Sequence, residues 1–251
     1  MIRPDTADDF VRDGFCVLPD ALSVDQVQSL NDAIDAHRRD YAGLWANRGE
    51  GGRRQCVTML LTDTALDHSL MHPELLPLVK SLVGDELVVE EHSVMVRAPI
   101  TQSPPPAGWH RDRPNNPDHP LGIEALSLVY YLTDVDTSTH CFSVVPESAE
   151  AKCGPQDDLP ACDGKGARDL LGPAGTALLF NAGSCHAGRL RTTPHERRTI
   201  HIYFGLASHA PLSNHTPMPR RLVEHEDAAV RELFRRPNDL TRAILKGTCH
   251  V

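Results

Sequence analysis

Side chains that can bind a metal ion stand out in one short segment of the chain. The segment Gly108-Trp109-His110-Arg111-Asp112 contains a His-x-Asp motif. In extended backbone, residues i and i+2 point to the same side, so His110 and Asp112 can reach one ion while Arg111 points away. An imidazole and a carboxylate suit Fe(II), Mn(II) or Zn(II). The motif alone is weak, since solvated polar turns also contain it, and a second copy, His225-Glu226-Asp227, lies in a stretch of helical spacing where these positions diverge.

A third ligand is available further along the chain. Residues 175–186 begin as an apolar strand, continue through a turn of small residues and end in His186. Two histidines and one carboxylate can occupy one face of an octahedron and leave three positions open, as in non-haem Fe(II) oxygenases. The predicted metal ligands are therefore His110, Asp112 and His186.

An arginine follows eleven residues after His186, at the start of a predicted strand. Strand alternation places Arg197, Thr199, His201 and Tyr203 on one face, which reads as a polar pocket wall. The intervening residues read as a packing face. Arg197 is thus positioned to form a two-point salt bridge with a ligand carboxylate. The alternative is that Arg197 and Arg198 are surface charges.

Four further residues are weaker candidates. Met95 and Tyr130 are assigned to the cofactor end of the pocket, and ordinary packing is the alternative for both. Trp109 is assigned to the substrate wall, although it could instead anchor its loop. Arg54 is assigned to an anionic substrate, together with Arg48 and Arg53 of the Gly-rich stretch 41–55. The alternative is that this stretch is a mobile, solvated loop.

The surrounding pattern predicts helices first and strands afterwards. Apolar residues recur at helical spacing in 24–37 and 72–83, and again in the tail 220–245. Short β-branched and aromatic runs at 87–97, 126–132, 141–145, 176–180 and 198–204 predict strands. No helical pattern separates these strands, so an antiparallel sandwich or barrel with helices on one side is expected. The proline-rich stretch 99–120 is expected to be irregular.

Composition excludes several classes of protein. The chain has 251 residues with 25 Lys+Arg and 34 Asp+Glu, for a net charge of −9. The absence of a dense basic block argues against nucleic acid as a partner. No apolar run reaches the roughly 18 residues of a membrane span, and the first residues lack the layout of a signal peptide. A small-molecule partner and a cytoplasmic location are expected, and the oligomeric state is not readable.

Seven cysteines are present, an odd number without CxxC spacing. This pattern fits a reducing compartment better than a disulfide framework. Cys153 and Cys162 flank a polar loop and form the one pair considered for a disulfide or a zinc site.

Three segments carry a resemblance to the phytanoyl-CoA dioxygenase family of Fe(II)/2-oxoglutarate-dependent oxygenases. They are "FVRDGFCVLPDALSVDQVQSL", "LSLVYYLTDVDTSTHCFSVVPESA" and "GPAGTALLFNAGSCHAG", the last followed by Arg197. The resemblance implies a mainly β fold with helical cover, a cupin-like double-stranded β-helix or jelly roll. It implies Fe(II) on His110, Asp112 and His186 and the far carboxylate of 2-oxoglutarate on Arg197. One departure is Glu147-Ser148-Ala149 after Pro146, where the family often has Gly-Ser-His.

The expected domain covers residues 1–251, with helical cover over 1–86, the jelly-roll core over 87–205 and a helical tail over 206–251. The expected reaction uses Fe(II), 2-oxoglutarate and O2 to hydroxylate a small-molecule metabolite, with release of succinate and CO2. Two alternatives stay open: a non-oxidative, metal-dependent cupin-like enzyme, and a non-catalytic jelly roll that binds a small molecule.

Overall fold

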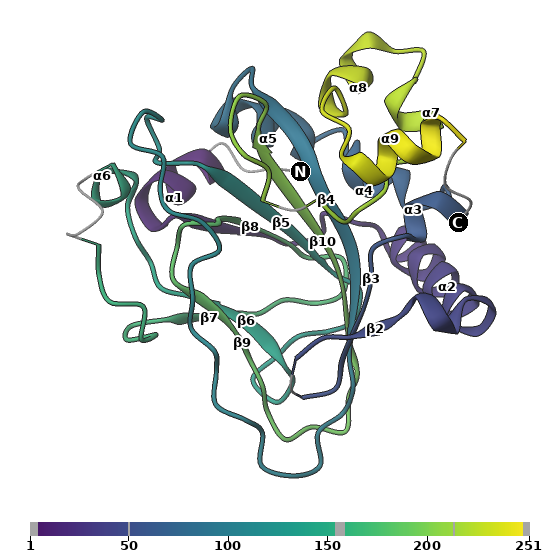
Figure 1. Ribbon diagram of the computed structural model, residues 1–251. Coiled ribbons are helices and arrows are strands. Elements are labelled where there is room, and N and C mark those ends of the chain that lie inside the picture. Colours follow the sequence, from purple (N-terminus) through teal and green to yellow (C-terminus); the bar gives the residue numbers. More distant parts are fainter. Residues whose placement is uncertain (1–4, 50, 154–158, 213, 248–251) are drawn as a thin grey trace.

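Two antiparallel sheets face one another in the computed structural model, which describes residues 5–49, 51–153, 159–212 and 214–247 (Figure 1). The large sheet has seven strands in the order β1-β8-β5-β10-β4-β3-β2, and the small sheet has the order β7-β6-β9. The large-sheet strands are β1 (Phe15–Leu18), β2 (Ala46–Asn47), β3 (Arg53–Cys56), β4 (Leu87–Arg97), β5 (Ala125–Tyr131), β8 (Ala177–Asn181) and β10 (Arg197–Leu206). The small-sheet strands are β6 (Cys141–Val144), β7 (Arg168–Leu170) and β9 (His186–Arg189). This is the predicted jelly roll.

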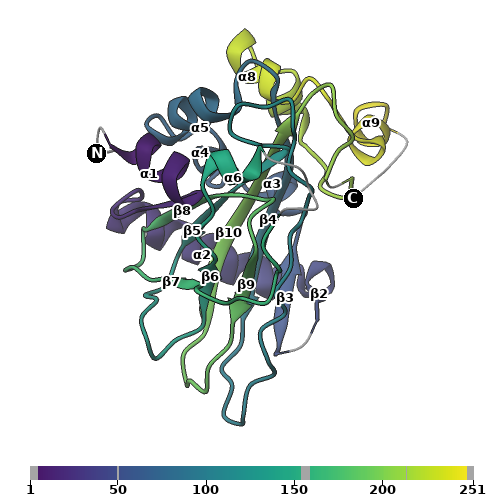
Figure 2. The ribbon, with the colours of Figure 1, turned by 90° about the vertical axis from the view of Figure 1, so that its left-hand side faces the viewer.

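Helices cover the outer face of the large sheet and its upper end (Figure 2). The longest, α2 (Val24–Asp40), begins with a capping box in which Ser23 and Gln26 bond reciprocally. The others are α1 (Thr6–Asp13), η1 (Ala42–Leu44), α3 (Met59–Thr62), α4 (Asp67–Leu70), α5 (Leu75–Val83), α6 (Ala149–Lys152), α7 (Arg220–Val223), α8 (Ala228–Leu233) and α9 (Asp239–Leu245). No helix within the described ranges is long and apolar enough to cross a membrane.

Strand alternation divides the core into two apolar clusters. The outer face of the large sheet, with Leu128 and Ile202, packs under the helices together with Ile34 of α2. The inner face packs against the small sheet through residues such as Val129 and Val144. The space between the two sheets is therefore where side chains of β4, β6, β9 and β10 can meet a ligand.

Several expectations are confirmed and others need correction. The long predicted helix and the predicted strands at 87–97, 126–132 and 198–204 are present, and stretch 99–120 contains no helix or strand. The expected loop at 41–55 is wrong in part, because β2 and β3 form a hairpin that pairs with β4. The short strands β7 and β9 were not predicted. The helical cover before residue 87 also supplies β1, β2 and β3 to the large sheet, and residues 248–251 of the expected tail lie outside the described residues.

Candidate metal centre

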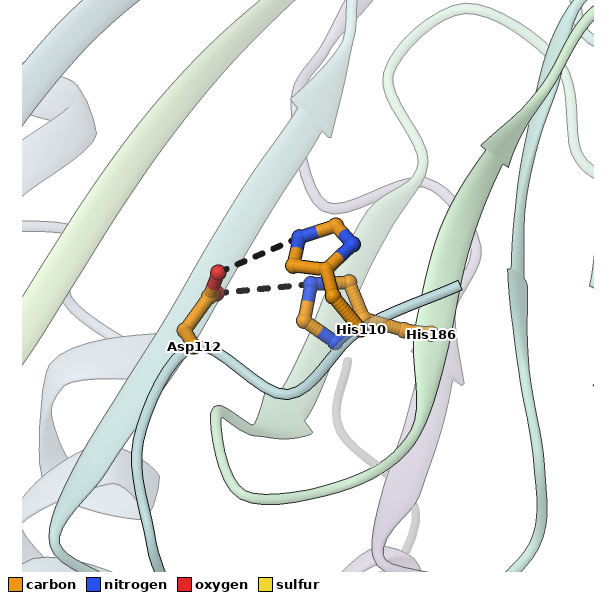
Figure 3. A group of neighbouring side chains, drawn as sticks. All are labelled: His110, Asp112 and His186. Carbon is orange, nitrogen blue, oxygen red and sulfur yellow. Dashed lines mark ion pairs between the residues drawn. The ribbon is translucent and has the colours of Figure 1, made fainter. Parts of the chain in front are cut away.

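His110, Asp112 and His186 converge at the mouth of the space between the sheets (Figure 3). Their ligand atoms all lie within 4.8 Å of one another. Nε2 of His110 is 3.3 Å from Oδ1 of Asp112, and Nε2 of His186 is 3.3 Å from Oδ2 of the same carboxylate. Two imidazole nitrogens and one carboxylate thus point at a common centre, as a facial metal triad requires.

Backbone pairing brings the two ligand segments together. The amide of His110 donates to the carbonyl of His186 at 3.0 Å, and the amide of His186 donates back at 2.9 Å. The amide of Asp112 donates to the carbonyl of Ala182 at 3.0 Å, in the turn between β8 and β9. His110 thus forms an isolated bridge with His186, and the backbone bends at Asp112, so the segment is not the continuous extended stretch that was expected. Its first and third side chains still share one side.

Hydrogen bonds at the far side of each ring prepare both histidines for a metal. Nδ1 of His110 lies 2.8 Å from the carbonyl of Gly108, and Nδ1 of His186 lies 2.9 Å from the carbonyl of Ser184. Because a carbonyl oxygen only accepts, each Nδ1 must carry the proton. Nε2 of the neutral ring is then a free lone-pair donor directed at the ion.

Asp112 is held as a carboxylate. Burial pushes its pKa upward, but the close contacts with the His110 and His186 rings and the hydrogen bond from Tyr203 outweigh this and bring the pKa well below its usual range. The Tyr203 hydroxyl donates to Oδ2 of Asp112 at 2.8 Å. A negatively charged ligand is therefore available at neutral pH.

A cavity of about 450 Å³ opens beside the triad. It lies between the large sheet and the small sheet, with residues of β4 and β10 on one side and residues of β6 and β9 on the other. Its lining is Arg48, Gly49, Arg53, Met95, Arg97, Pro105, Pro106, Gly108, His110, Asp112, Phe142, His186, Gly188, Leu190, Arg197, His201 and Tyr203.

Arg197 lies inside this cavity, and some of its hydrogen-bond donors have no partner among the described residues. Only 4% of its surface is exposed, and its Nε and Nη1 atoms have no hydrogen-bond partner within the described chain. Its guanidinium lies 4.4 Å from the centre of the Phe142 ring, a cation–π contact that leaves the edge of the fork available. Buried unpaired donors are costly, so this arginine fits a ligand carboxylate such as the distal one of 2-oxoglutarate.

His201 is a second buried polar residue that the cavity leaves without a partner. Neither ring nitrogen has a hydrogen-bond partner in the described residues. Burial, aided by the charges of Arg197 and Arg53, lowers the pKa of His201 to about 3. The ring is therefore neutral and can donate one hydrogen bond to a ligand without adding charge.

Met95 lines the cavity as predicted, but Tyr130 does not. Tyr130 lies on the outer face of β5, in the core under the helices, and its hydroxyl donates to the carbonyl of Ser69 at 3.0 Å. The neighbouring Tyr131 points inward instead. Its hydroxyl donates to Leu170 and accepts from the amide of Phe142, which fixes the strand that carries the Phe142 ring.

Trp109 and Arg54 are also placed away from the cavity. The Trp109 ring packs on Gly164, where a Cβ would come within 2.0 Å of the ring, so the residue anchors its loop. Arg54 turns to the other side of β3 and donates to the carbonyls of Ala42 and Trp45. Arg53 lines the cavity in its place, because adjacent strand residues face opposite sides.

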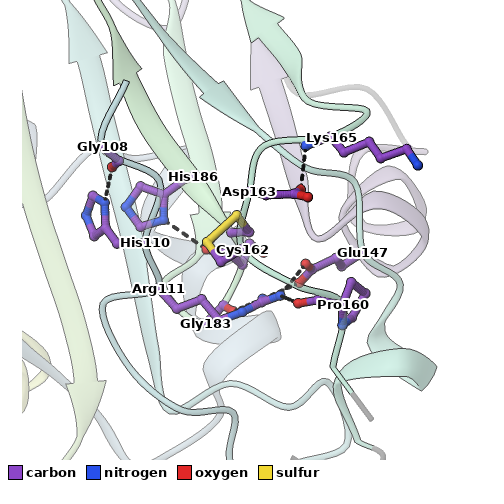
Figure 4. Close-up of a disulfide and its surroundings, with 12 residues drawn as sticks. Gly108, His110, Arg111, Glu147, Pro160, Cys162, Asp163, Lys165, Gly183 and His186 are labelled. Carbon is purple, nitrogen blue, oxygen red and sulfur yellow. Dashed lines mark hydrogen bonds and ion pairs between the residues drawn. A yellow bond between two sulfur atoms is a disulfide. The ribbon is translucent and has the colours of Figure 1, made fainter. Parts of the chain in front are cut away.

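Hydrogen bonds of the Arg111 side chain hold the loop that carries the His-x-Asp motif (Figure 4). Arg111 donates to both carboxylate oxygens of Glu147 at 2.7 Å and to the carbonyls of Gly183 and Pro160. Glu147 is buried and also accepts from Lys152 at 2.8 Å. This bracing role of Glu147 was not predicted, although its place after Pro146 marked it as unusual.

A disulfide joins Cys162 to Cys185, the residue before the metal ligand His186. The expected lack of disulfides and the considered pair of Cys153 with Cys162 are therefore both wrong, since Cys153 is free. The partner could not be read from the sequence, because β9 and its turn bring together residues 23 positions apart.

Comparisons with known proteins agree with this geometry. A family model described as phytanoyl-CoA dioxygenase matches residues 10–199. A protein named dioxygenase af480, from Aspergillus fumigatus, is 27% identical over 263 residues, covering 92% of this chain and 81% of that protein.

Solved structures share the fold at low sequence identity. The carbocyclase SnoK from nogalamycin biosynthesis has a TM-score of 0.67 and 17% identity, covering 95% of this chain and 92% of its own. The epimerase SnoN from the same biosynthesis has a TM-score of 0.64 and 19% identity, covering 82% of this chain and 84% of its own. HygX from Streptomyces hygroscopicus, solved with nickel and 2-oxoglutarate, has a TM-score of 0.64 and 17% identity, covering 92% of this chain and 94% of its own.

The family match spans β1 through the start of β10, and so includes all three triad residues and Arg197. It also favours the oxidative class over the non-oxidative and non-catalytic alternatives. This chain belongs to the phytanoyl-CoA dioxygenase family and is a dioxygenase dependent on Fe(II), 2-oxoglutarate and O2.

Proposed function

We propose that the enzyme hydroxylates a small-molecule metabolite and releases succinate and CO2. The observation that carries this proposal is the position of the triad and of Arg197 in one cavity of about 450 Å³. That volume lies within the range of roughly 300 to 1,000 Å³ that is usual for small-molecule sites.

Each site residue has a distinct role in this proposal. His110, Asp112 and His186 hold Fe(II) by the atoms that already converge, and Arg197 binds the far carboxylate of 2-oxoglutarate through its unpaired donors. Met95 packs against the cosubstrate from β4. When bound, the iron and 2-oxoglutarate supply the oxidant: one oxygen atom of O2 enters succinate as CO2 leaves, and the other enters a substrate C–H bond.

Hydroxylation is favoured over epimerisation by what lines the cavity. The structural relatives include proteins described as an epimerase and a carbocyclase, so the fold does not fix the outcome. An epimerase must return a hydrogen to the substrate carbon. Among the described lining residues no cysteine is present, and the tyrosine there, Tyr203, already donates its hydroxyl to Asp112. Transfer of the oxygen to the substrate needs no such donor, so this lining is consistent with hydroxylation and disfavours epimerisation.

A small molecule is also the kind of ligand found in relatives. SnoN has been solved with Fe(III), 2-oxoglutarate and nogalamycin RO, and HygX with nickel, 2-oxoglutarate and hygromycin B. Those ligands belong to those proteins. For this chain they support the class of substrate and no particular compound.

The test is to screen metabolites for substrate-dependent succinate release and to analyse the product made under ¹⁸O2. We expect a product heavier by one ¹⁸O atom and formed in proportion to succinate, and no product from Asp112→Ala. A product that has lost two hydrogens, or has the mass of the substrate with no added oxygen, would replace hydroxylation with desaturation or isomerisation.

A further inference from the structure

Three arginines lie next to one another on neighbouring strands of the large sheet and line the cavity. In the large sheet, Arg53 of β3 is directly opposite Arg97 of β4, and Arg97 is directly opposite Arg197 of β10. All three line the cavity, and Arg48 from the β2–β3 hairpin adds a fourth guanidinium. Like charges that are directly opposite in a sheet destabilise it, so this row needs a reason beyond folding.

Carboxylates are scarce in the described lining around Arg53 and Arg197. Asp112, the metal ligand, is the only carboxylate among the described lining residues. Arg53 donates to the carbonyl of Arg48 at 3.1 Å, which does not neutralise either group. Glu91 of β4 accepts from Gln55 at 3.3 Å and is not part of the lining.

Burial and the neighbouring positive charges lower the pKa values of two of these arginines. Burial, with added repulsion from Arg197 and Arg53, lowers the pKa of Arg97 to about 10. Burial also lowers the pKa of Arg53. Guanidinium groups stay protonated at these values, so the cavity holds several positive charges that have lost part of their hydration.

The turn of the β2–β3 hairpin packs closely against Arg97. Gly51 has a φ of +70°, and a Cβ there would lie 3.1 Å from Nη1 of Arg97 and 2.5 Å from the Leu190 side chain. A glycine is therefore required for the turn to lie so close. The turn holds Arg48 and Arg53 at the edge of the cavity, next to Arg97.

The cosubstrate does not neutralise the row. If the proposed function is correct, Fe(II), Asp112 and the chelating carboxylate of 2-oxoglutarate sum to zero charge. Its one remaining carboxylate can then be bound by Arg197. This leaves the two hairpin arginines, Arg53 and Arg48, without an anion among the described lining residues. All four cations are arginines, whose planar fork suits oxoanions.

We propose that the substrate is an anion, a small molecule whose carboxylate, phosphate or sulfate group is bound by Arg53 and Arg48 beside the 2-oxoglutarate site. This inference rests on the proposed function and adds the substrate class. The anionic group would anchor the molecule at the hairpin, and the rest of the molecule would extend toward the triad.

The test uses the Fe(II)–2-oxoglutarate protein under anaerobic conditions, with hexanoate, hexyl phosphate, hexyl sulfate and neutral hexanamide as probes in calorimetric titrations. We expect at least one of the anions to bind about tenfold or more tightly than hexanamide, without displacement by excess 2-oxoglutarate. Comparison of the three anions identifies which oxoanion is preferred.

Arg53→Gln should remove the preference for that anion, and Arg54→Gln is the matched control, since the neighbouring side chain faces away. Arg53→Lys, which keeps the charge, should retain part of the preference and guards against a folding defect in the glutamine variant. Equal binding of hexanamide, no binding of any anion, displacement by 2-oxoglutarate, or full anion binding by Arg53→Gln would each overturn the inference. Loss of Fe(II)-dependent 2-oxoglutarate binding by the wild type would instead contradict the proposed function.

Discussion

Asp112 has two carboxylate oxygens, and the Tyr203 hydroxyl bonds one of them at 2.8 Å. This contact restricts the rotation of the carboxylate and leaves Oδ1 free to point at the ion. The contact also links β10 to the proposed metal ligands, since Tyr203 and Arg197 line the same cavity from that strand. Partners of this kind tune metal affinity without touching the metal.

Replacing Tyr203 by phenylalanine removes this hydrogen bond and keeps the ring. We expect Fe(II) affinity to fall by about tenfold or more, measured by anaerobic metal titration. Tyr130→Phe is the matched control. It removes a buried bond to the Ser69 carbonyl, so it should lower the free energy of unfolding by about 1 kcal/mol and leave metal affinity unchanged. A metal affinity that fell with Tyr130→Phe and not with Tyr203→Phe would reverse the assignment of the two tyrosines.

At the scale of elements, the site joins an irregular loop, which carries His110 and Asp112, to the β8–β9 turn and the start of β9, which carries His186. The His-x-Asp loop is fixed to the β8–β9 turn by the backbone pairing of His110 with His186 and by Arg111, which reaches Glu147, Gly183 and Pro160 together. The Cys162–Cys185 disulfide joins the same turn to the loop that precedes β7. The metal ligands are thus positioned by cross-links between loops, built behind the triad.

Arg111→Lys tests this bracing while keeping the charge. A lysine cannot bond both oxygens of Glu147 and two carbonyls at once, so we expect a loss of about 1 to 3 kcal/mol in the free energy of unfolding and weaker metal binding. The measurements are urea unfolding and metal titration. Arg113→Lys serves as control, because Arg113 donates to Ala210, outside this network. Unchanged stability and metal affinity in Arg111→Lys would show that the loop is held by its backbone alone.

The same elements show what the sequence could and could not predict. In β10 the two faces differ in polarity, so alternation alone placed Arg197, His201 and Tyr203 on the cavity side. In β5 both faces are buried, so alternation carries no polar signal and does not distinguish the outward Tyr130 from the inward Tyr131. In β3 two arginines are adjacent, and only the pairing with β4 decides that Arg53 faces the cavity.

At the scale of the whole molecule, two buried histidines of the large sheet affect stability. Burial lowers the pKa of His92 in β4 to about 3, and it also lowers the pKa of His201 in β10 to about 3. The unfolded chain binds a proton at each histidine near its ordinary pKa of about 6.5, whereas the folded chain does not. Between about pH 6.5 and 3 the unfolded state therefore binds more protons, and stability falls as the pH falls.

His92→Asn should reduce this dependence on pH. In urea unfolding between pH 6.5 and 5, we expect the loss of stability per pH unit to be smaller in the variant by up to about 1.4 kcal/mol, which corresponds to one proton. His195→Asn, at an exposed position before β10, is the matched control. Equal slopes for the wild type and His92→Asn would mean that His92 titrates alike in the folded and unfolded chains.

The most direct test of the account is an anaerobic titration of 2-oxoglutarate with and without Fe(II). We predict one binding site that requires Fe(II), is lost in His186→Ala and is weakened by about tenfold or more in Arg197→Gln. Arg198→Gln should bind normally, because Arg198 pairs with Asp35 and Glu196 away from the cavity. Binding of 2-oxoglutarate that needed no Fe(II), or that Arg197→Gln left unchanged, would contradict the account.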